Sequence, residues 1–165
     1  MKQAAFTIIE LAVTMVIIGL IVTLAVPAFS EIVMSQRRLD VAQQLASGIR
    51  TARTEAIIRS RPVVIRAIED NWSKGWQIVV DPKGSDDDLV LTERTRSGKV
   101  PVLGNQHVTR QIRFNALGSP SDSGFVAGRL FICDVNDALS HHTVVMANTG
   151  RVRIESITTP EKLCG

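Results

Sequence analysis

The stretch that decides the fold lies near the N-terminus, where residues 6–29 read FTIIELAVTMVIIGLIVTLAVPAF. This apolar run is interrupted by one charged residue, Glu10. As a helix, its roughly 24 residues extend about 36 Å, which is long enough to cross the hydrocarbon core of a bilayer with some tilt. A carboxylate in such a segment costs about 2.5–3.5 kcal/mol at the bilayer centre. We therefore expect a membrane-spanning helix in which Glu10 has a function; an ordinary signal anchor with Glu10 at the interface is the alternative.

The rest of the chain has the composition of a single soluble domain. The chain has 165 residues, 45% of them hydrophobic, and the apolar run accounts for a large share of these. Lys and Arg number 19 against 16 Asp and Glu, and without Lys2 the balance is 18 to 16, a net charge of +2. This balance does not indicate a nucleic-acid-binding protein, so any such function depends on where the basic residues lie.

The two cysteines are expected to form a disulfide. Lys2 precedes the apolar run, which places it on the cytoplasmic side of the membrane and the rest of the chain on the outer side. Cys133 and Cys164 then lie in an oxidising compartment, where a bridge closing about 32 residues restricts the unfolded chain by about 3–4 kcal/mol. Two free thiols are the alternative, and a zinc site is not expected because the ligand spacing typical of zinc is missing.

A second helical segment is expected over residues 30–60, continuing the first. Apolar residues recur at helical spacing, and Arg61-Pro62 ends the segment. These residues are Leu39, Ala42, Leu45, Ala46, Ile49, Ala52 and Ala56. Five arginines lie mostly off this stripe, namely Arg37, Arg38, Arg50, Arg53 and Arg59. We interpret them as a solvated helix face rather than as DNA contacts.

After Pro62 the sequence changes to short β-rich runs separated by turn residues. We expect residues 61–165 to form an antiparallel β domain, and the order of a long helix followed by strands predicts an α+β fold. Asn148-Thr149-Gly150 is predicted to be a hairpin turn, and residues 119–124 a polar loop. The predicted strands are 62–68, 76–80, 89–93, 108–114, 129–133, 143–146 and 151–157.

The sequence shows no catalytic constellation. It has no ordered nucleophile and base, no glycine-rich phosphate loop and no Tyr. Asp81 and Asp86-Asp87-Asp88 do not follow the alternating pattern of a calcium loop, so we expect a solvated acidic loop rather than a calcium site. Adjacent His141 and His142 point to opposite faces of a strand and cannot easily share one ion. We therefore expect a protein that is not an enzyme and has neither cofactor nor metal.

The most informative soluble stretch is residues 148–154, which read NTGRVRI. Asn and Gly in the turn allow positive φ, so the chain can reverse there. Arg151 and Arg153 are two residues apart in the outgoing strand, so both guanidinium groups project from one face. Two arginines on an exposed hairpin can bind phosphates without reading sequence. Any half-buried strand has the same alternation, so the pattern alone leaves a purely structural strand open.

The segment Ala5-Phe6-Thr7-Ile8-Ile9-Glu10 resembles the processing site of type IV pilins and type II secretion pseudopilins. In that family a prepilin peptidase cuts before the aromatic residue and methylates the new N-terminus. The resemblance implies cleavage between Ala5 and Phe6, with residues 1–5 as the discarded leader. It also implies that Glu10 neutralises the N-terminus of a neighbouring subunit during assembly. The family usually has Gly where this chain has Ala5, and we expect cleavage to persist at a lower rate.

The segment Gly150-Arg151-Val152-Arg153 resembles the GRxR signature of the FimT minor pilins, a branch of the GspH/FimT family. In that branch the motif lies near the C-terminus and binds DNA captured for natural transformation. The resemblance implies a pilin fold, in which an antiparallel sheet packs on the outer half of a long helix. It also implies that Gly150, Arg151 and Arg153 form a DNA contact without sequence specificity.

Two functions follow from these resemblances. The first is a minor type IV pilin, held in the bacterial inner membrane by one span with its C-terminal domain in the periplasm, that joins other pilins in the extracellular pilus and binds DNA for uptake by competent cells. The second is a structural minor pilin or type II secretion pseudopilin that primes fibre assembly without binding DNA. Only the C-terminal hairpin distinguishes them, and Cys133–Cys164 is expected to brace this segment in the first.

Overall fold

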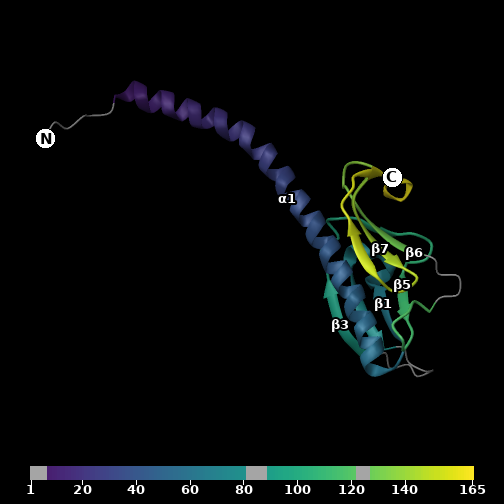
Figure 1. The fold of residues 1–165 in the computed structure, drawn as a ribbon. Helices are drawn as coiled ribbons and strands as arrows, with labels where there is room; N and C mark the ends of the chain where they lie inside the picture. Colours follow the sequence, from purple (N-terminus) through teal and green to yellow (C-terminus); the bar gives the residue numbers. More distant parts are fainter. Residues whose placement is uncertain (1–6, 81–88, 122–126) are drawn as a thin grey trace. The chain divides into compact units, whose positions relative to one another are not determined.

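The computed structural model describes residues 7–80, 89–121 and 127–165 (Figure 1). The chain divides into two compact units, of which the first ends at Arg37 and the second begins at Arg38. The long helix α1, Ile8–Arg59, contributes to both. The predicted acidic loop at residues 81–88 lies outside the described residues.

The first unit is the N-terminal part of α1, which begins with a capping box. The Thr7 backbone N–H donates to Glu10 Oε2 at 3.0 Å, and the Glu10 N–H donates to Thr7 Oγ1 at 3.3 Å. This reciprocal pair satisfies two of the backbone donors that a helix start leaves open. Side chains further along, such as Leu11 and Ile21, are apolar and exposed. By length and composition this part of α1 is able to cross a membrane.

In the second unit, the core-facing stripe of α1 consists of small and apolar residues. Each is at most 1% exposed: Val41, Ala42, Leu45, Ala46, Ile49, Ala52 and Ala56. The spacing predicts that Leu39 belongs to this stripe, but Leu39 is only half-buried because the buried cluster begins at Val41. The other predicted positions of the stripe are buried.

Helix α1 ends at Arg59, just before Arg61-Pro62, the pair that predicts the end of the helix. Ser60 has a φ of 49°, in the left-handed region. Its N–H donates to Ile57 O, and the Arg61 N–H donates to Ala56 O, both at 3.2 Å. These two bonds form a Schellman motif, which satisfies carbonyl groups that the end of the helix leaves open.

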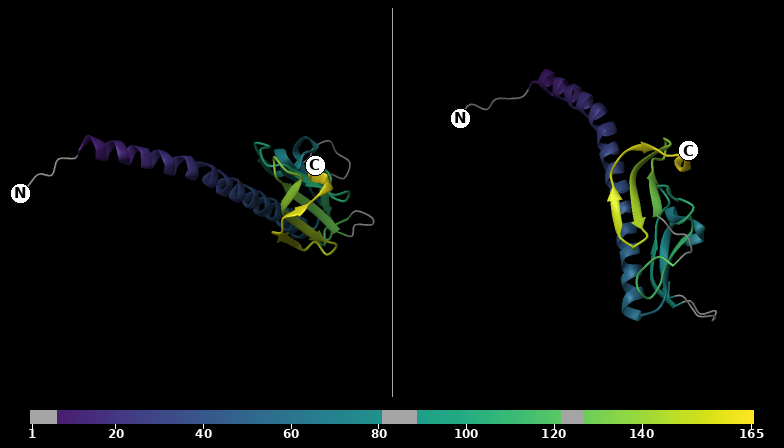
Figure 2. Two further views of the ribbon diagram at one scale, coloured as in Figure 1. Left: turned by 90° about the horizontal axis from the view of Figure 1, so that it is seen from above. Right: turned by 45° about the vertical axis from the view of Figure 1, so that its right-hand side comes forward.

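The strands in the described residues form two antiparallel sheets packed on α1 (Figures 1 and 2). One sheet has the order β3-β2-β1-β5, and the other has the order β4-β6-β7-β8, with β9 also paired to β7. The strands are β1 Val63–Ala67, β2 Gly75–Val80, β3 Leu89–Thr95, β4 Val102–Gly104, β5 Gln111–Phe114, β6 Ala127–Cys133, β7 Leu139–Ala147, β8 Val152–Glu155 and β9 Thr159–Pro160. Short 3₁₀ turns lie at Ile68–Asp70, Trp72–Lys74 and Lys162–Cys164.

The predicted α+β order is confirmed, and a strand is present in each of the predicted strand segments, with shifted ends. Strands β4 and β9 were not predicted. Strand β4 has three residues and β9 has two, so neither is long enough to show an alternation of apolar and polar residues.

Arg38 is not part of a solvated helix face, contrary to the sequence-based expectation. Its side chain is 4% exposed, and Nη1 donates to Asp134 Oδ2 at 2.7 Å. The Asn136 N–H donates to Asp134 Oδ1 at 2.8 Å. This hydrogen bond, and then the charge of Arg38, lowers the pKa of Asp134 against the opposing effect of burial. The ion pair joins α1 to the loop that follows β6.

We expect Asp134→Asn to destabilise the segment 30–165 by about 3 kcal/mol, because it removes the negative charge that the buried Arg38 side chain contacts at 2.7 Å. The folded-state pKa of Asp134 is lowered, so its stabilising contribution is present above the unfolded pKa of about 3.9 and is lost as the pH falls through the folded pKa. Urea unfolding at pH 7 and at pH 3 measures both effects. The stability difference between variant and wild type should shrink at the lower pH, and an unchanged difference would contradict this role.

Candidate functional site

The predicted basic hairpin is formed by β7 and β8. The Ala147 N–H donates to Arg151 O, and the Gly150 N–H donates to Ala147 O, both at 2.9 Å. Gly150 has a φ of 77°. A turn followed by glycine in the left-handed region is a three-residue hairpin loop with a bulge. The loop Asn148-Thr149-Gly150 therefore reverses the chain as its sequence predicts, and it sets the register of β8.

Gly150 is buried at a position that has no room for a side chain. A Cβ atom there would lie 2.7 Å from Gly118 O and 3.1 Å from Arg53 Nε. Arg53 Nη1 also donates to Gly150 O at 3.2 Å. The structure thus gives Gly150 a role in the turn and its packing, and its predicted contact with DNA stays a prediction.

Two arginines of α1 donate hydrogen bonds to backbone carbonyl groups along the outer edge of the hairpin, at β8 and the turn before it. Arg50 Nη2 donates to Val152 O at 3.2 Å, in the same way that Arg53 donates to Gly150 O. Strand β8 is the last strand on its sheet's path, so these carbonyl groups belong to an edge that needs cover. Arg50 is exposed, but Arg53 is half-buried, so the predicted solvated face is wrong for Arg53. Sequence reasoning missed both roles, because the acceptors lie 102 and 97 residues further along the chain.

Arg151 and Arg153 are exposed, whereas Val152 between them belongs to the core. Arg153 Nε and Nη2 lie 2.8 Å and 2.7 Å from Glu155 Oε1. The two side chains are 55% and 36% exposed, so the pair contributes only about 0.2–1 kcal/mol. Glu155 was not among the predicted site residues, although its spacing of two from Arg153 in a strand is a signal that places both on one face.

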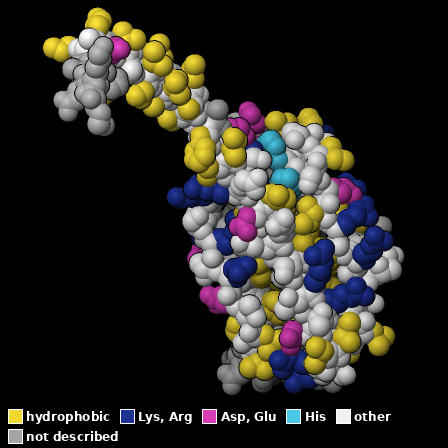
Figure 3. Space-filling view, turned by 60° about the vertical axis from the view of Figure 1, so that its left-hand side comes forward, with side chains coloured by type: hydrophobic (Ala, Val, Ile, Leu, Met, Phe, Trp, Pro, Cys, Tyr) yellow, Lys and Arg dark blue, Asp and Glu magenta, His cyan; other side chains and the backbone are white. Residues whose placement is uncertain are grey.

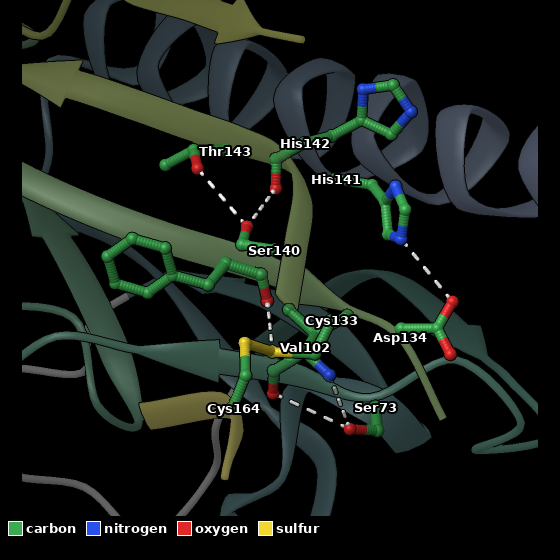
Figure 4. Close-up of a disulfide and its surroundings, with 10 residues drawn as sticks. Ser73, Val102, Cys133, Asp134, Ser140, His141, His142, Thr143 and Cys164 are labelled. Carbon is green, nitrogen blue, oxygen red and sulfur yellow. Dashed lines mark hydrogen bonds and ion pairs between the residues drawn. A yellow bond between two sulfur atoms is a disulfide. The ribbon is translucent and has the colours of Figure 1, made fainter. Parts of the chain in front are cut away.

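A disulfide joins Cys133, the last residue of β6, to Cys164 near the C-terminus (Figure 4). The two Cα atoms are 5.7 Å apart. Strand β9, a few residues before Cys164 in the chain, pairs with Leu139 and Ser140 of β7. The predicted cysteine pairing is present, and together with β9 it ties the C-terminal segment to the sheet that contains the hairpin.

The adjacent histidines of β7 contact different partners, and Figure 4 shows the contact of His141 with Asp134. His141 Nε2 lies 3.4 Å from Asp134 Oδ2, and His142 Nδ1 lies 3.1 Å from Ser156 Oγ. Burial, followed by the charges of His141 and Arg38, lowers the pKa of His142. In the part of the chain that the structure describes, no group of three His, Cys, Asp or Glu side chains is placed to hold a metal ion.

Glu10 is the described part of the predicted processing and assembly site, since Ala5 and Phe6 lie outside the described residues. Besides the capping bonds to the backbone, Thr7 Oγ1 donates to Glu10 Oε2 at 2.9 Å. Thr7 directly follows Phe6 in the chain. The Glu10 carboxylate is therefore hydrogen-bonded to the residue that follows the predicted cleavage site by one position.

An apolar N-terminal helix that continues into a domain of two antiparallel sheets defines a pilin-like subunit. Residues 41–150 match the family model described as Type II transport protein GspH, and residues 1–26 match the model of the prokaryotic N-terminal methylation motif. The first match covers more than half of the chain, and the protein belongs to the GspH family. This match ends at Gly150, so Arg151 and Arg153 lie beyond it.

Two solved structures share the fold, and both are crystal structures of the type IV minor pilin FimU from Pseudomonas aeruginosa strain PAO1, in space groups P21 and P65. Their TM-scores are 0.63 and 0.61, with 20% sequence identity in each case. The alignments cover 79% and 77% of this chain and 96% and 99% of the FimU chains. These likenesses confirm the predicted pilin fold. A search of curated proteins found no match.

We expect Gly150→Ala to destabilise the segment 30–165 by more than about 2 kcal/mol, because alanine is strained at this φ and its Cβ would collide with Gly118 O. Gly98→Ala is the matched control. Gly98 has a φ of 72°, but no atom lies within 4 Å of the position that a Cβ atom would take, so only the strain of about 1–2 kcal/mol applies. Urea unfolding of both variants measures the difference. Equal losses would show that the hairpin does not depend on this close approach.

Proposed function

We propose that this GspH-family protein is a minor type IV pilin that binds extracellular DNA through Arg151 and Arg153, for uptake in natural transformation. The family and the fold establish the broader role of minor pilin or pseudopilin. The observation that supports DNA binding is the exposure of both arginines on a hairpin whose backbone is held by α1. The resemblance of residues 150–153 to the FimT signature supports the same function.

The anchored hairpin suits phosphate binding for a physical reason. Arg53 and Arg50 fix the carbonyl groups on either side of Arg151, so the strand that presents both exposed arginines is already ordered before a ligand binds. Binding then costs less conformational entropy than ordering a flexible tail. The guanidinium group binds phosphate oxygens through two parallel hydrogen bonds, and contacts of this kind carry no sequence information.

The alternative is a structural minor pilin or type II secretion pseudopilin that primes fibre assembly. One observation favours it: Arg153 already has a partner in Glu155, as in an ordinary surface strand. The exposed pair is weak, however, and a phosphate with two acceptor oxygens is able to replace the carboxylate. The two functions therefore differ in whether Arg153 exchanges Glu155 for DNA.

We expect the segment 30–165 to bind short DNA duplexes with a Kd of about 10⁻⁴–10⁻⁶ M and a salt dependence of about −0.9 in log–log slope for each phosphate contact. NMR titration should shift the amide signals of Arg151 and Arg153. The double variant Arg151→Gln/Arg153→Gln should lose both affinity and salt dependence, yet remain folded because both side chains are exposed. Undiminished binding by the folded double variant would make the structural pilin the better assignment.

The matched variant Glu155→Gln tests the same contact between Arg153 and DNA, but here the affinity for DNA should increase. It keeps the size of the side chain, removes the acidic partner of Arg153 and leaves the guanidinium available for phosphate. Loss of a competing pair worth about 0.2–1 kcal/mol corresponds to an affinity gain of about one and a half- to fivefold. A gain is expected in the titration above, and an unchanged affinity would argue against a contact between Arg153 and DNA.

We also infer that the chain is processed between Ala5 and Phe6 and then methylated at Phe6. The match of residues 1–26 to the methylation motif supports this inference. The helix that follows supports anchoring in the inner membrane before assembly, and the Cys133–Cys164 disulfide suits a periplasmic C-terminal domain. During assembly with other pilins, Glu10 would exchange its bonds with Thr7 for the N-terminal amine of a neighbouring subunit.

Mass spectrometry of the full-length chain produced with a prepilin peptidase should show the loss of residues 1–5 and the addition of a methyl group to Phe6. Glu10→Ala should be processed and inserted in the membrane, because its apolar character increases, but it should be absent from purified fibres. An N-terminus at Met1, or one near Ser30 from ordinary signal peptidase, would contradict the processing site. Normal amounts of Glu10→Ala in fibres would contradict the assembly role.

A further inference from the structure

The sheet that contains the hairpin has a third arginine in line with the other two. Arg129 of β6 lies opposite Val145 of β7, and Val145 lies opposite Arg153 of β8. Residues directly opposite each other in antiparallel strands project from the same face of the sheet. Arg129 is exposed, as Arg153 is, and the core residues Leu130 and Val144 project from the other face.

The strand pairing sets the distances between these arginines. Neighbouring strands are about 4.8 Å apart, so the Cα atoms of Arg129 and Arg153 are separated by roughly 10 Å. Arg151 and Arg153 are two residues apart along the chain, which corresponds to roughly 7 Å in a strand. Both distances are within about one Debye length at 0.1 M salt. They are also comparable to the groove widths of duplex DNA, about 6 Å and 12 Å, so the three charges are able to act on one DNA segment.

Val145 lies between two of these arginines on the outward face. The residue is only 4% exposed, although its side chain projects away from the core that the sheet shares with α1. The aliphatic stems of arginine side chains pack along apolar neighbours while their charged ends stay in water. Val145 is therefore an apolar residue between Arg129 and Arg153 along which their aliphatic stems are able to pack.

The charge on this face is net positive, with Arg129, Arg151 and Arg153 against Glu155. In β6, β7 and β8, which the structure describes in full, Glu155 is the single acidic residue. Figure 3 shows several Lys and Arg side chains gathered in a band on the surface of the β domain. The whole chain has a formal net charge of only +3, so a local excess of this kind is not visible in the composition. A concentrated positive field attracts polyanions and increases their rate of association.

We propose that Arg129 is a third phosphate-binding residue, so that the DNA surface is the outward face of β6, β7 and β8 rather than the hairpin alone. This inference rests on the proposed DNA binding, and Arg129 lies outside the sequence motif that indicated it. Three arginines on a stiff sheet contact phosphates along one backbone or across a groove. Arg129 adds affinity and salt dependence without adding sequence preference.

The test is a salt series with the full-length chain in uncharged detergent micelles, using fluorescence anisotropy of labelled duplex and single-stranded DNA. Arg129→Gln should weaken binding and reduce the log–log salt slope by about 0.9 on duplex and about 0.7 on single-stranded DNA. Arg94→Gln is the matched control, since Arg94 is exposed on β3 of the other sheet and the same charge is removed. Arg129→Lys should keep most of the slope, because it keeps the charge but loses the planar fork of donors.

The outcomes distinguish this inference from the proposed function. A reduced slope for Arg129→Gln, with a slope close to wild type for Arg94→Gln, supports the third contact. Equal binding by these two variants overturns the role of Arg129. If the double variant Arg151→Gln/Arg153→Gln then loses binding in the same assay, the hairpin alone is the site. If the double variant also binds as wild type does, both the inference and the proposed function are wrong.

Discussion

The second unit depends on the close approach of two sheets to one face of α1. That face is lined by alanines that are completely buried, namely Ala42, Ala46, Ala52 and Ala56. Small side chains let strands pack close to the helix backbone, and at Gly48 a Cβ atom would lie 2.5 Å from Trp76 Nε1. A larger side chain on this face would have to displace a sheet, because a close-packed interior does not absorb added volume. The shape of α1 thus determines where both sheets lie.

The same packing determines which polar residues of α1 lie at the margins of the core. Arg38, Arg50 and Arg53 are all at such margins, and each donates a hydrogen bond to the sheet domain. Arg38 donates to the carboxylate of Asp134, next to the disulfide, whereas Arg50 and Arg53 donate to backbone carbonyl groups at the edge of β8. Arg53 Nε is buried and has no hydrogen-bond partner among the described residues, which indicates that packing around Gly150 positions this side chain as much as its hydrogen bond does. The backbone of the basic hairpin is therefore fixed to α1, while Arg151 and Arg153 remain exposed.

The sequence predicts the features that depend on local pattern. The apolar run, the helical stripe and the Asn148-Thr149-Gly150 turn each have a signal within one continuous segment of the chain, and the structure contains all three. The features that it misses depend on partners far along the chain. A solvated helix face and an arginine that reaches a carbonyl about 100 residues away have the same local sequence. The burial of Gly150 has the same origin, because the neighbouring Gly118 belongs to a different turn.

Arg129 shows a further limit of local pattern. It is not recognisable as part of the candidate site until the register of β6, β7 and β8 is known, because its position next to Arg153 depends on the strands between them. Glu155 differs, since its spacing of two from Arg153 places it on the same face once β8 is recognised as a strand. Once the register is known, the face contains three cations and one anion, and the anion is paired with the central cation of the set. An unopposed cluster of arginines binds anionic surfaces without discrimination. Glu155 weakens that attraction. The binding of a long polyanion is affected less, because a contact that breaks at one phosphate can form again at the next.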